Sequence, residues 1–176
     1  PDNVRQTLVL GKHPDPALQA SGIRFLPILH SGNSQRSEEE AQRIRVLYDD
    51  LLKHHHIDRK GQKHRLCSQD ILVVAPYNLQ VNLLRQTLPE GARVGTVDKF
   101  QGQEAPVVIV SMATSSEDYL PRDIGFLFSK NRLNVAISRA KCLAIVVASP
   151  DLLAVKCHTV EQMALVNLLC RVAEYE

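Results

Sequence analysis

The chain has 176 residues, a formal net charge of +2, 44% hydrophobic residues and 23% charged residues. This length fits one globular domain rather than two and suffices for a substantial core. The small net charge excludes a strong overall attraction to a polyanion, so any such contact has to be local. The sequence contains no stretch of 18 or more apolar residues, so we expect no membrane-spanning segment and no membrane partner.

The four cysteines are Cys67, Cys142, Cys157 and Cys170, and none of them belongs to a C-x-x-C pair. Cys142 lies in an apolar run and Cys170 in a helical pattern, so we expect both thiols to be buried. This cysteine usage and the missing signal peptide predict a reducing compartment and a cytoplasmic location. Because the sequence begins with Pro1 rather than Met, we expect an excised piece or a processed start.

The first part of the chain shows no periodic pattern. Pro14 and Pro16 interrupt residues 1–22, so an arm or linker is predicted ahead of a domain over residues 23–176.

The first predicted strand covers residues 23–29. Pro27 within it favours an edge position, because proline has no N–H to donate to the hydrogen bonds between strands. A capping-box pattern at residues 37–40 precedes apolar residues at helical spacing, which predicts a helix over 38–53. The polar and basic segment 54–67 is predicted to be a surface loop.

Unbroken apolar runs alternate with helical patterns over the rest of the chain. Strands are predicted over residues 71–75, 93–97, 107–112 and 142–148, and helices over residues 78–88, 131–140, a short piece from Pro150, and 160–174. Strands without alternating polar residues are typical of a parallel sheet that helices cover on both faces. The predicted fold class is therefore α/β.

Three polar segments fall at the ends of these strands or beside them, at residues 76–80, 96–104 and 131–141. Functional loops of parallel sheets gather at the carboxyl ends of the strands. In the third segment, Arg132 and Arg139 would lie on a packed helix, where a guanidinium can present its planar fork to a phosphate. Spacing alone, however, favours ordinary surface arginines.

The other two segments also leave alternatives open. Gly102 allows a turn in which backbone N–H groups approach a ligand, with Gln101 and Glu104 pointing into a cleft. A plain turn between two strands explains this pattern equally well. In the segment 75–80, Tyr77 is either a stacking ring or a core aromatic, and the core interpretation is favoured.

The three motifs in order are far more specific than any one alone. They are A-P-Y-x-x-Q at 75–80, T-V-D-x-F-Q-G-x-E at 96–104 and N-x-L-N-V-A-x-S-R-A-K at 131–141. Together they resemble motifs IV, V and VI of superfamily 1 helicases. The resemblance is strongest to the 5′-to-3′ branch of the nonsense-mediated-decay RNA helicase and the replication nuclease-helicases, and to bacterial helicases fused to a RecB-like nuclease.

This resemblance covers residues 23–153 and implies a RecA-like sheet of the P-loop NTPase fold, as the second motor domain of an ATP-dependent helicase. Arg139 matches the arginine finger of motif VI, and the catalytic set that the resemblance implies is Arg139, Gln101 and Glu104. The implied nucleotide-binding residues are Gly102, Tyr77, Gln80, Asn134 and Ser138. The implied nucleic-acid-binding residues are Thr96 and Asp98, and no metal ligand is expected in this chain.

Helicases of this family bind ATP with Mg²⁺ between two RecA-like domains, and the first domain carries the phosphate-binding loop and holds the metal. This chain contains no G-x-x-x-x-G-K-[ST], so we expect it not to hydrolyse ATP alone. The expected partners are that first domain and single-stranded nucleic acid, DNA in preference to RNA. Some relatives place a second phosphate-contacting arginine where this chain has Val81, and Arg85 and Arg36 are the candidates to replace it.

Two other functions compete with this interpretation. A RecA-like docking or nucleic-acid-binding module without catalysis is disfavoured because Gln101, Glu104 and Arg139 are intact, and a metabolic nucleotide-binding enzyme because no G-x-G-x-x-G occurs. His54 to His56, His64 and Cys67 match no standard zinc spacing, so a loop that touches nucleic acid is favoured over a metal site.

Overall fold

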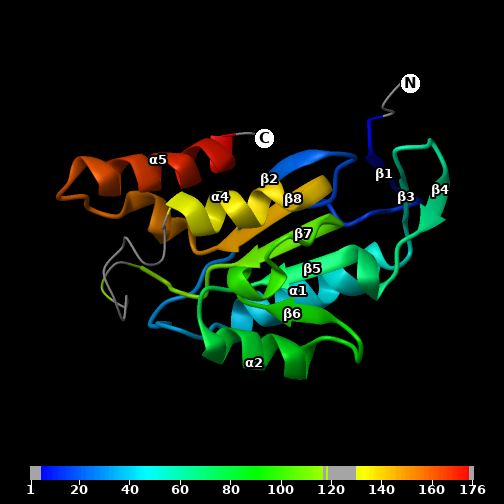
Figure 1. The fold of residues 1–176 in the computed structure, drawn as a ribbon. Coiled ribbons are helices and arrows are strands. Elements are labelled where there is room, and N and C mark those ends of the chain that lie inside the picture. The colour runs from blue at the N-terminus through cyan, green and yellow to red at the C-terminus, as the bar shows by residue number, and fades with distance from the viewer. Residues whose placement is uncertain (1–4, 117, 119–129, 175–176) are drawn as a thin grey trace.

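The computed structural model describes residues 5–116, 118 and 130–174. Its main feature is a five-stranded sheet with helices on both faces (Figure 1). The strands run parallel in the order β2 (Gly22–Pro27), β8 (Ala140–Ala148), β7 (Ala105–Ser111), β5 (Ile71–Val74) and β6 (Arg93–Gly95). The predicted α/β class with a parallel sheet is confirmed.

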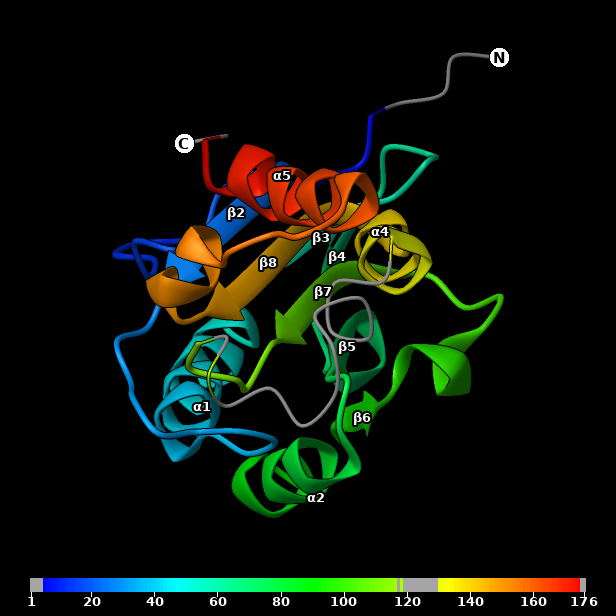
Figure 2. The same cartoon turned by 90° about the vertical axis from the view of Figure 1, so that its left-hand side faces the viewer.

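Helices from the described part of the chain cover both faces of this sheet, as Figure 2 shows from the side of the strands' carboxyl ends. On one face lie α1 (Glu38–Leu51) and α2 (Asn78–Thr87), and on the other lie α4 (Lys130–Ser138) and α5 (Val160–Glu174).

The central strands are buried on both sides. Along β5, Ile71 and Val73 join the core under α1 and α2, whereas Leu72 and Val74 join the core under α4 and α5. This double burial is why these strands read as unbroken apolar runs.

The edge position predicted for the proline-containing strand is confirmed. Among the described strands of this sheet, β2 pairs with β8 alone and so lies at the edge. Pro27, which has no N–H to donate, therefore does not interrupt the hydrogen bonding of a central strand. At the next element, the Ser37 hydroxyl accepts a hydrogen bond from the Glu40 N–H at 3.2 Å and caps α1 as predicted.

A second, three-stranded antiparallel sheet corrects two predictions. It consists of β1 (Thr7–Val9), β3 (His55–Ile57) and β4 (Lys63–Arg65) in the order β1-β3-β4. Residues 7–9 are therefore not irregular, and residues 54–67 are a hairpin rather than a loop. Strands of three residues are too short to show a period of two, which is why the sequence pattern did not reveal them.

Some boundaries also differ from the prediction. The strand predicted over 93–97 ends at Gly95, and a 3-10 helix, η2 (Val97–Phe100), follows it. Two further 3-10 helices are η1 (Ser68–Asp70) and η4 (Pro150–Ala154). Within the described residues, no helix is both long and apolar enough to cross a membrane.

Candidate functional site

A crevice on the α4 face of the sheet gathers several of the predicted site residues. It lies between η2 and α4 and has a volume of about 220 Å³. The residues that line it are Val97, Asp98, Gln101, Arg132, Val135 and Arg139. We call it the α4 crevice.

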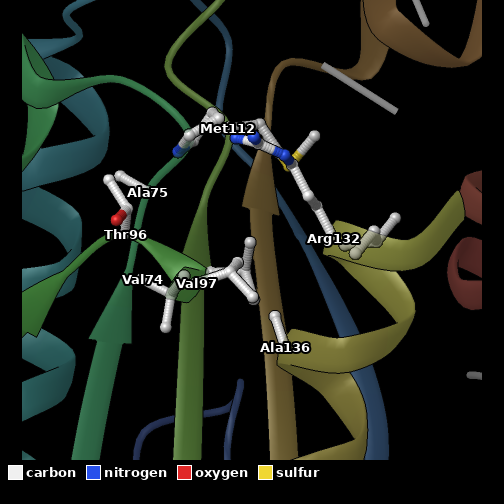
Figure 3. Close-up of a pocket in the computed structure, with 10 residues that line it drawn as sticks. Val74, Ala75, Thr96, Val97, Met112, Arg132 and Ala136 are labelled. Carbon is white, nitrogen blue, oxygen red and sulfur yellow. The ribbon is translucent and has the colours of Figure 1, made fainter. Parts of the chain in front are cut away.

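A narrow depression at the carboxyl ends of the strands adjoins the α4 crevice and shares Val97 and Arg132 with it. Figure 3 shows Thr96 and Val97 on one side of this depression and α4 on the other, with the Arg132 side chain reaching across toward Met112. The two adjoining hollows form one continuous surface, with Thr96 lining the depression at the strand ends and Arg139 lining the α4 crevice.

The chain from β6 to β7 is held in place by Phe100, whose ring is buried in the core under α4. The cationic groups of Arg93 and Lys99 both lie 5.7 Å from the centre of this ring. The Lys99 ammonium also donates a hydrogen bond to the Val94 carbonyl oxygen at 3.1 Å. These contacts fix the backbone that carries Gln101.

Gly102 has a positive φ, a backbone conformation that residues with a side chain rarely adopt. Gln101 has φ −53° and ψ 127°, Gly102 has φ +76°, and the Gln103 N–H donates to the Phe100 carbonyl oxygen at 2.9 Å. These values define a type II turn, whose third residue needs a positive φ. The turn leaves the side chains of Gln101 and Glu104 exposed.

Arg139 is placed by α4 and by the sheet. Leu133 and Ala136 bury one side of α4 in the core, and the helix ends just before Arg139. The Arg139 carbonyl oxygen accepts a hydrogen bond from the Ala105 N–H at 3.0 Å. Its Nε is buried and makes no hydrogen bond within the described part of the chain. A backbone fixed by the sheet thus places the Arg139 guanidinium at the crevice, with one buried N–H that the described residues leave unsatisfied.

Arg132, which the sequence analysis named beside Arg139 but which the implied site set leaves out, lines this site. Its guanidinium lies 3.9 Å from the Asp98 carboxylate, which links α4 to η2. Arg132 lies in the first turn of α4 and Arg139 directly after its last residue, and both line the crevice. The sequence pattern did not show that the two arginines meet at one hollow.

Not every predicted residue reaches the α4 crevice. Tyr77 is buried in the core under α4, and Asn134 is exposed on α4. The Ser138 hydroxyl donates to the Val135 carbonyl oxygen of its own helix at 2.8 Å. Glu104 is exposed beside the first residue of β7 and is not one of the residues that line the crevice.

Gln80 is fully buried on the other face of the sheet, with its amide engaged in the fold. Its carbonyl oxygen accepts from the Ser37 N–H at 2.8 Å, and its NH₂ donates to the Ser37 carbonyl oxygen at 3.2 Å and to the Ser111 hydroxyl at 2.9 Å. The residue therefore joins the start of α1 to the end of β7. Within the domain it positions neighbouring segments.

Glu40 extends this buried network, and the sequence pattern assigned it a different role. Its carboxylate accepts from the Ser111 hydroxyl at 2.6 Å and from the Ala113 N–H at 3.0 Å, and it lies 2.9 Å from Nε2 of His30. The capping box predicted for Ser37 and Glu40 is thus only half formed, because the Glu40 side chain turns to the sheet. The network fixes the segments that follow β2 and β7.

The two arginines considered as replacements at the position after Gln80 are both engaged elsewhere. Arg85 donates to the Val94 carbonyl oxygen at 3.1 Å, and Arg36 pairs with Glu38 on the surface. Val81, which occupies that position, is buried in the core.

The histidines of the hairpin region pair with carboxylates. His54 Nδ1 accepts from the Gly11 N–H at 2.9 Å, and its Nε2 lies 3.0 Å from Asp50. His64 lies 2.8 Å from Asp58. Among the described residues, no three His, Cys, Asp or Glu side chains converge as metal ligands would.

Comparison with known proteins identifies the relatives of this chain. The family model of an AAA domain matches residues 24–151, which is most of the chain. The putative helicase mov-10-B.2 of Danio rerio is 33% identical over 150 residues, covering 72% of this chain and 15% of its own length.

Of two other relatives, one is named as a DNA helicase and the other as an RNA helicase. The DNA polymerase alpha-associated DNA helicase A of Schizosaccharomyces pombe is 48% identical over 77 residues, covering 42% of this chain and 11% of its own length. The RNA helicase Mov10l1 of Mus musculus is 41% identical over 96 residues, covering 51% of this chain and 8% of its own length. The chain thus spans less than a fifth of each of these three relatives.

Proposed function

This chain belongs to the AAA domain family as a second RecA-like domain of the superfamily 1 helicase type, and from that premise we propose that it is the C-terminal motor domain of an ATP-dependent helicase. In this proposal it supplies an arginine finger and part of the surface that binds a single strand, DNA in preference to RNA. The observation that carries the proposal is Arg139, whose backbone is fixed by Ala105 and whose buried Nε has no hydrogen-bond partner in the described structure.

The residues of the α4 crevice fit the polyphosphate of ATP. Arg139 and Arg132 bring two guanidinium groups to it, and Gln101 adds an amide that can donate or accept. Bound ATP with Mg²⁺ would supply the phosphoanhydride bond, with the metal held by the first domain. Arg139 would then stabilise the negative charge that develops on the transferred phosphoryl group.

The remaining predicted residues take supporting roles in this proposal. Gln101 and Glu104, on the exposed turn, would orient the attacking water once the first domain closes over the crevice. Thr96 and Asp98, at the other end of the same loop, would contact the strand. Because Thr96 lies at a strand end and Gln101 lies in the crevice, one short loop would link the strand to the nucleotide.

The test is strand-stimulated ATP hydrolysis by the full-length protein, with ATP affinity measured beside it. We expect Arg139→Ala to lower turnover by about 10³-fold or more and to change ATP affinity far less, because the finger acts in the transition state. Arg139→Lys keeps the charge but not the fork, and we expect it to recover only part of the loss.

Arg171→Ala is the matched control, since Arg171 is an exposed arginine on the last turn of α5. An equal loss of ATP affinity with unchanged turnover would refute the finger role of Arg139. A wild-type protein that no strand stimulates would favour a docking module instead. Parallel titrations with single-stranded DNA and RNA of one sequence test the preference for DNA.

A further inference from the structure

A second hollow lies outside the α4 crevice, at the amino ends of β2 and β8. Its volume is about 420 Å³, and it shares no lining residue with the crevice. It is lined by Arg5, Gln6, Ser21, Gly22, Arg59, Lys141 and Cys142. Three of these residues are cationic, and none of these described lining residues is acidic.

The cationic groups of the hollow are not neutralised inside the fold. Arg5 donates a hydrogen bond to the Ser21 hydroxyl at 3.3 Å, and Arg59 and Lys141 have no hydrogen-bond or ion-pair partner among the residues that the structure describes. Burial raises the pKa of the Cys142 thiol to about 11, so this thiol is neutral near pH 7 and adds no negative charge. No carboxylate lines the hollow among the described residues, so positive charge is concentrated there.

The positive surface continues from the hollow onto the β3–β4 hairpin. Exposed along the hairpin are Arg59, Lys60, Lys63 and Arg65. In a domain whose net charge is only +2, this is a strong local concentration.

Asp58, the one acidic residue of the hairpin, forms hydrogen bonds within the turn between β3 and β4. The Asp58 carboxylate accepts from the Lys60 N–H at 2.8 Å and from the Gln62 N–H at 2.9 Å, and it lies 2.8 Å from His64. The hydrogen bond from His64 and those from the two backbone amides hold the pKa of Asp58 at about 2. The carboxylate thus shapes the turn and, being ionised near pH 7, offsets one positive charge of the hairpin, while the exposed cations of the hairpin outnumber it.

The position of this surface separates it from the strand contacts proposed for Thr96. The hairpin projects beyond the amino ends of the large sheet (Figure 1), and in Figure 2 it lies behind the carboxyl ends that face the viewer. Thr96 follows the carboxyl end of β6. The two surfaces therefore lie at opposite ends of the sheet.

We propose that the hairpin and the hollow form a second nucleic-acid site that grips the phosphodiester backbone, with Arg59 and Lys141 around one phosphate and Lys60, Lys63 and Arg65 along its neighbours. A row of exposed cations that extends past the hollow suits a polyanion better than a single anion. Contacts of this kind carry no base information, so binding is independent of sequence and weakens steeply with salt.

The test compares two single strands on the full-length protein, by fluorescence anisotropy over a series of salt concentrations. One strand, of about 10 nucleotides, fills only the main site, and the other is several times longer and reaches the hairpin. We expect Arg59→Glu to leave the Kd of the short strand unchanged and to raise that of the long strand about tenfold or more. The slope of log affinity against log salt for the long strand falls by about 1 or more.

Arg171→Glu is the matched charge reversal on an exposed arginine elsewhere, and it should change neither strand's Kd. Lys141→Ala should act in the same direction as Arg59→Glu, because Lys141 also lines the hollow. Unchanged long-strand binding in both hollow variants would overturn the proposal.

Turnover at saturating strand separates this inference from the proposed motor function. Arg59→Glu should keep the maximal rate of ATP hydrolysis, whereas Arg139→Ala should lose it and still bind the long strand. If Arg59→Glu lowers turnover and leaves strand binding intact, the hairpin contacts the neighbouring motor domain, and the nucleic-acid site is refuted.

Discussion

A buried carboxylate organises the end of the sheet opposite the hairpin. Glu40 is fully buried, and its two oxygens are shared by Ser111, Ala113 and His30. Ala113 also has φ +67°, a strained conformation for a residue with a side chain, and its N–H is one of the groups that Glu40 holds. A buried charge is tolerated only with such a full set of partners.

We expect Glu40→Ala to lower the free energy of unfolding by about 3 to 5 kcal/mol, because it leaves buried donors without an acceptor. Glu40→Gln should cost less, since one amide oxygen can still accept. Urea unfolding of the purified chain, followed by circular dichroism, measures both. Glu38→Gln, at an exposed residue of the same helical turn, is the control and should stay within about 0.5 kcal/mol of the wild type. A loss below about 1 kcal/mol for Glu40→Ala would contradict this account.

The limits of sequence interpretation are clearest at single residues. Tyr77 is buried, as its segment alone favoured, and Gln80, which the resemblance implied as a nucleotide-binding residue, is also buried. Which side of a helix or turn faces inward depends on neighbours far along the chain, such as Ser37 and Ser111 for Gln80. A local pattern holds no information about them.

At the scale of elements, the segment before β2 is fastened to α1. Asp15 accepts two hydrogen bonds from the guanidinium fork of Arg43, at 2.8 and 2.6 Å, and its own N–H donates to Asp50 at 2.9 Å. Ala17 and Leu18 are buried in the core beside α1. The segment predicted as an arm therefore packs as part of the folded unit over these residues.

This fastening predicts a dependence of stability on pH. Burial acts to raise the pKa of Asp15, but the hydrogen bonds from Arg43 and from the Ala17 N–H outweigh it, so the pKa lies below its usual value of 3.8. A carboxyl group with a lowered folded-state pKa stabilises the fold above its unfolded pKa. That stabilisation is lost as the pH falls through the lowered value.

We expect Asp15→Asn to lower the free energy of unfolding by about 1 to 2 kcal/mol near pH 7, with the difference from wild type shrinking as the pH falls below 3.8. Urea unfolding at several pH values measures it. Asp49→Asn is the control, because Asp49 forms an exposed ion pair with Arg45 one turn away. A difference that persists unchanged at low pH would show that Asp15 acts through packing rather than charge.

The strands that the sequence predicted and those it missed differ in one physical respect. β5, β7 and most of β8 are buried on both faces, so their sequences are almost entirely apolar. In β3 and β4 the residues are mostly polar, and their place is set by pairing with each other and with β1. Sequence patterns record burial, and they do not record strand pairing.

For the whole molecule, the proposed function makes the α4 crevice one half of a composite site. The α4 crevice offers cationic and amide groups, and the sequence contains no G-x-x-x-x-G-K-[ST] loop to cradle phosphates. We therefore expect the isolated chain to release no phosphate from ATP above background, with or without a single strand.

A phosphate-release assay on the purified chain checks this, with the Arg139→Ala chain prepared in parallel. A rate that persists in the variant marks a contaminating enzyme. Robust turnover that the variant abolishes would contradict the prediction and would mean that this domain holds ATP productively without its neighbour.

The place of β2 in the sheet has a consequence for how the molecule is made. β2 comes far earlier in the chain than β8, which is its partner in the large sheet among the described residues, with residue 22 beside residue 143. On the ribosome, β2 emerges long before the strand that it needs. Until β8 follows, the nascent sheet lacks its connection to β2, and closing so long a loop makes this a late and slow step of folding. Strand β2 would therefore be among the last parts of the domain to gain protection from amide hydrogen exchange during synthesis, and among those most exposed to a chaperone.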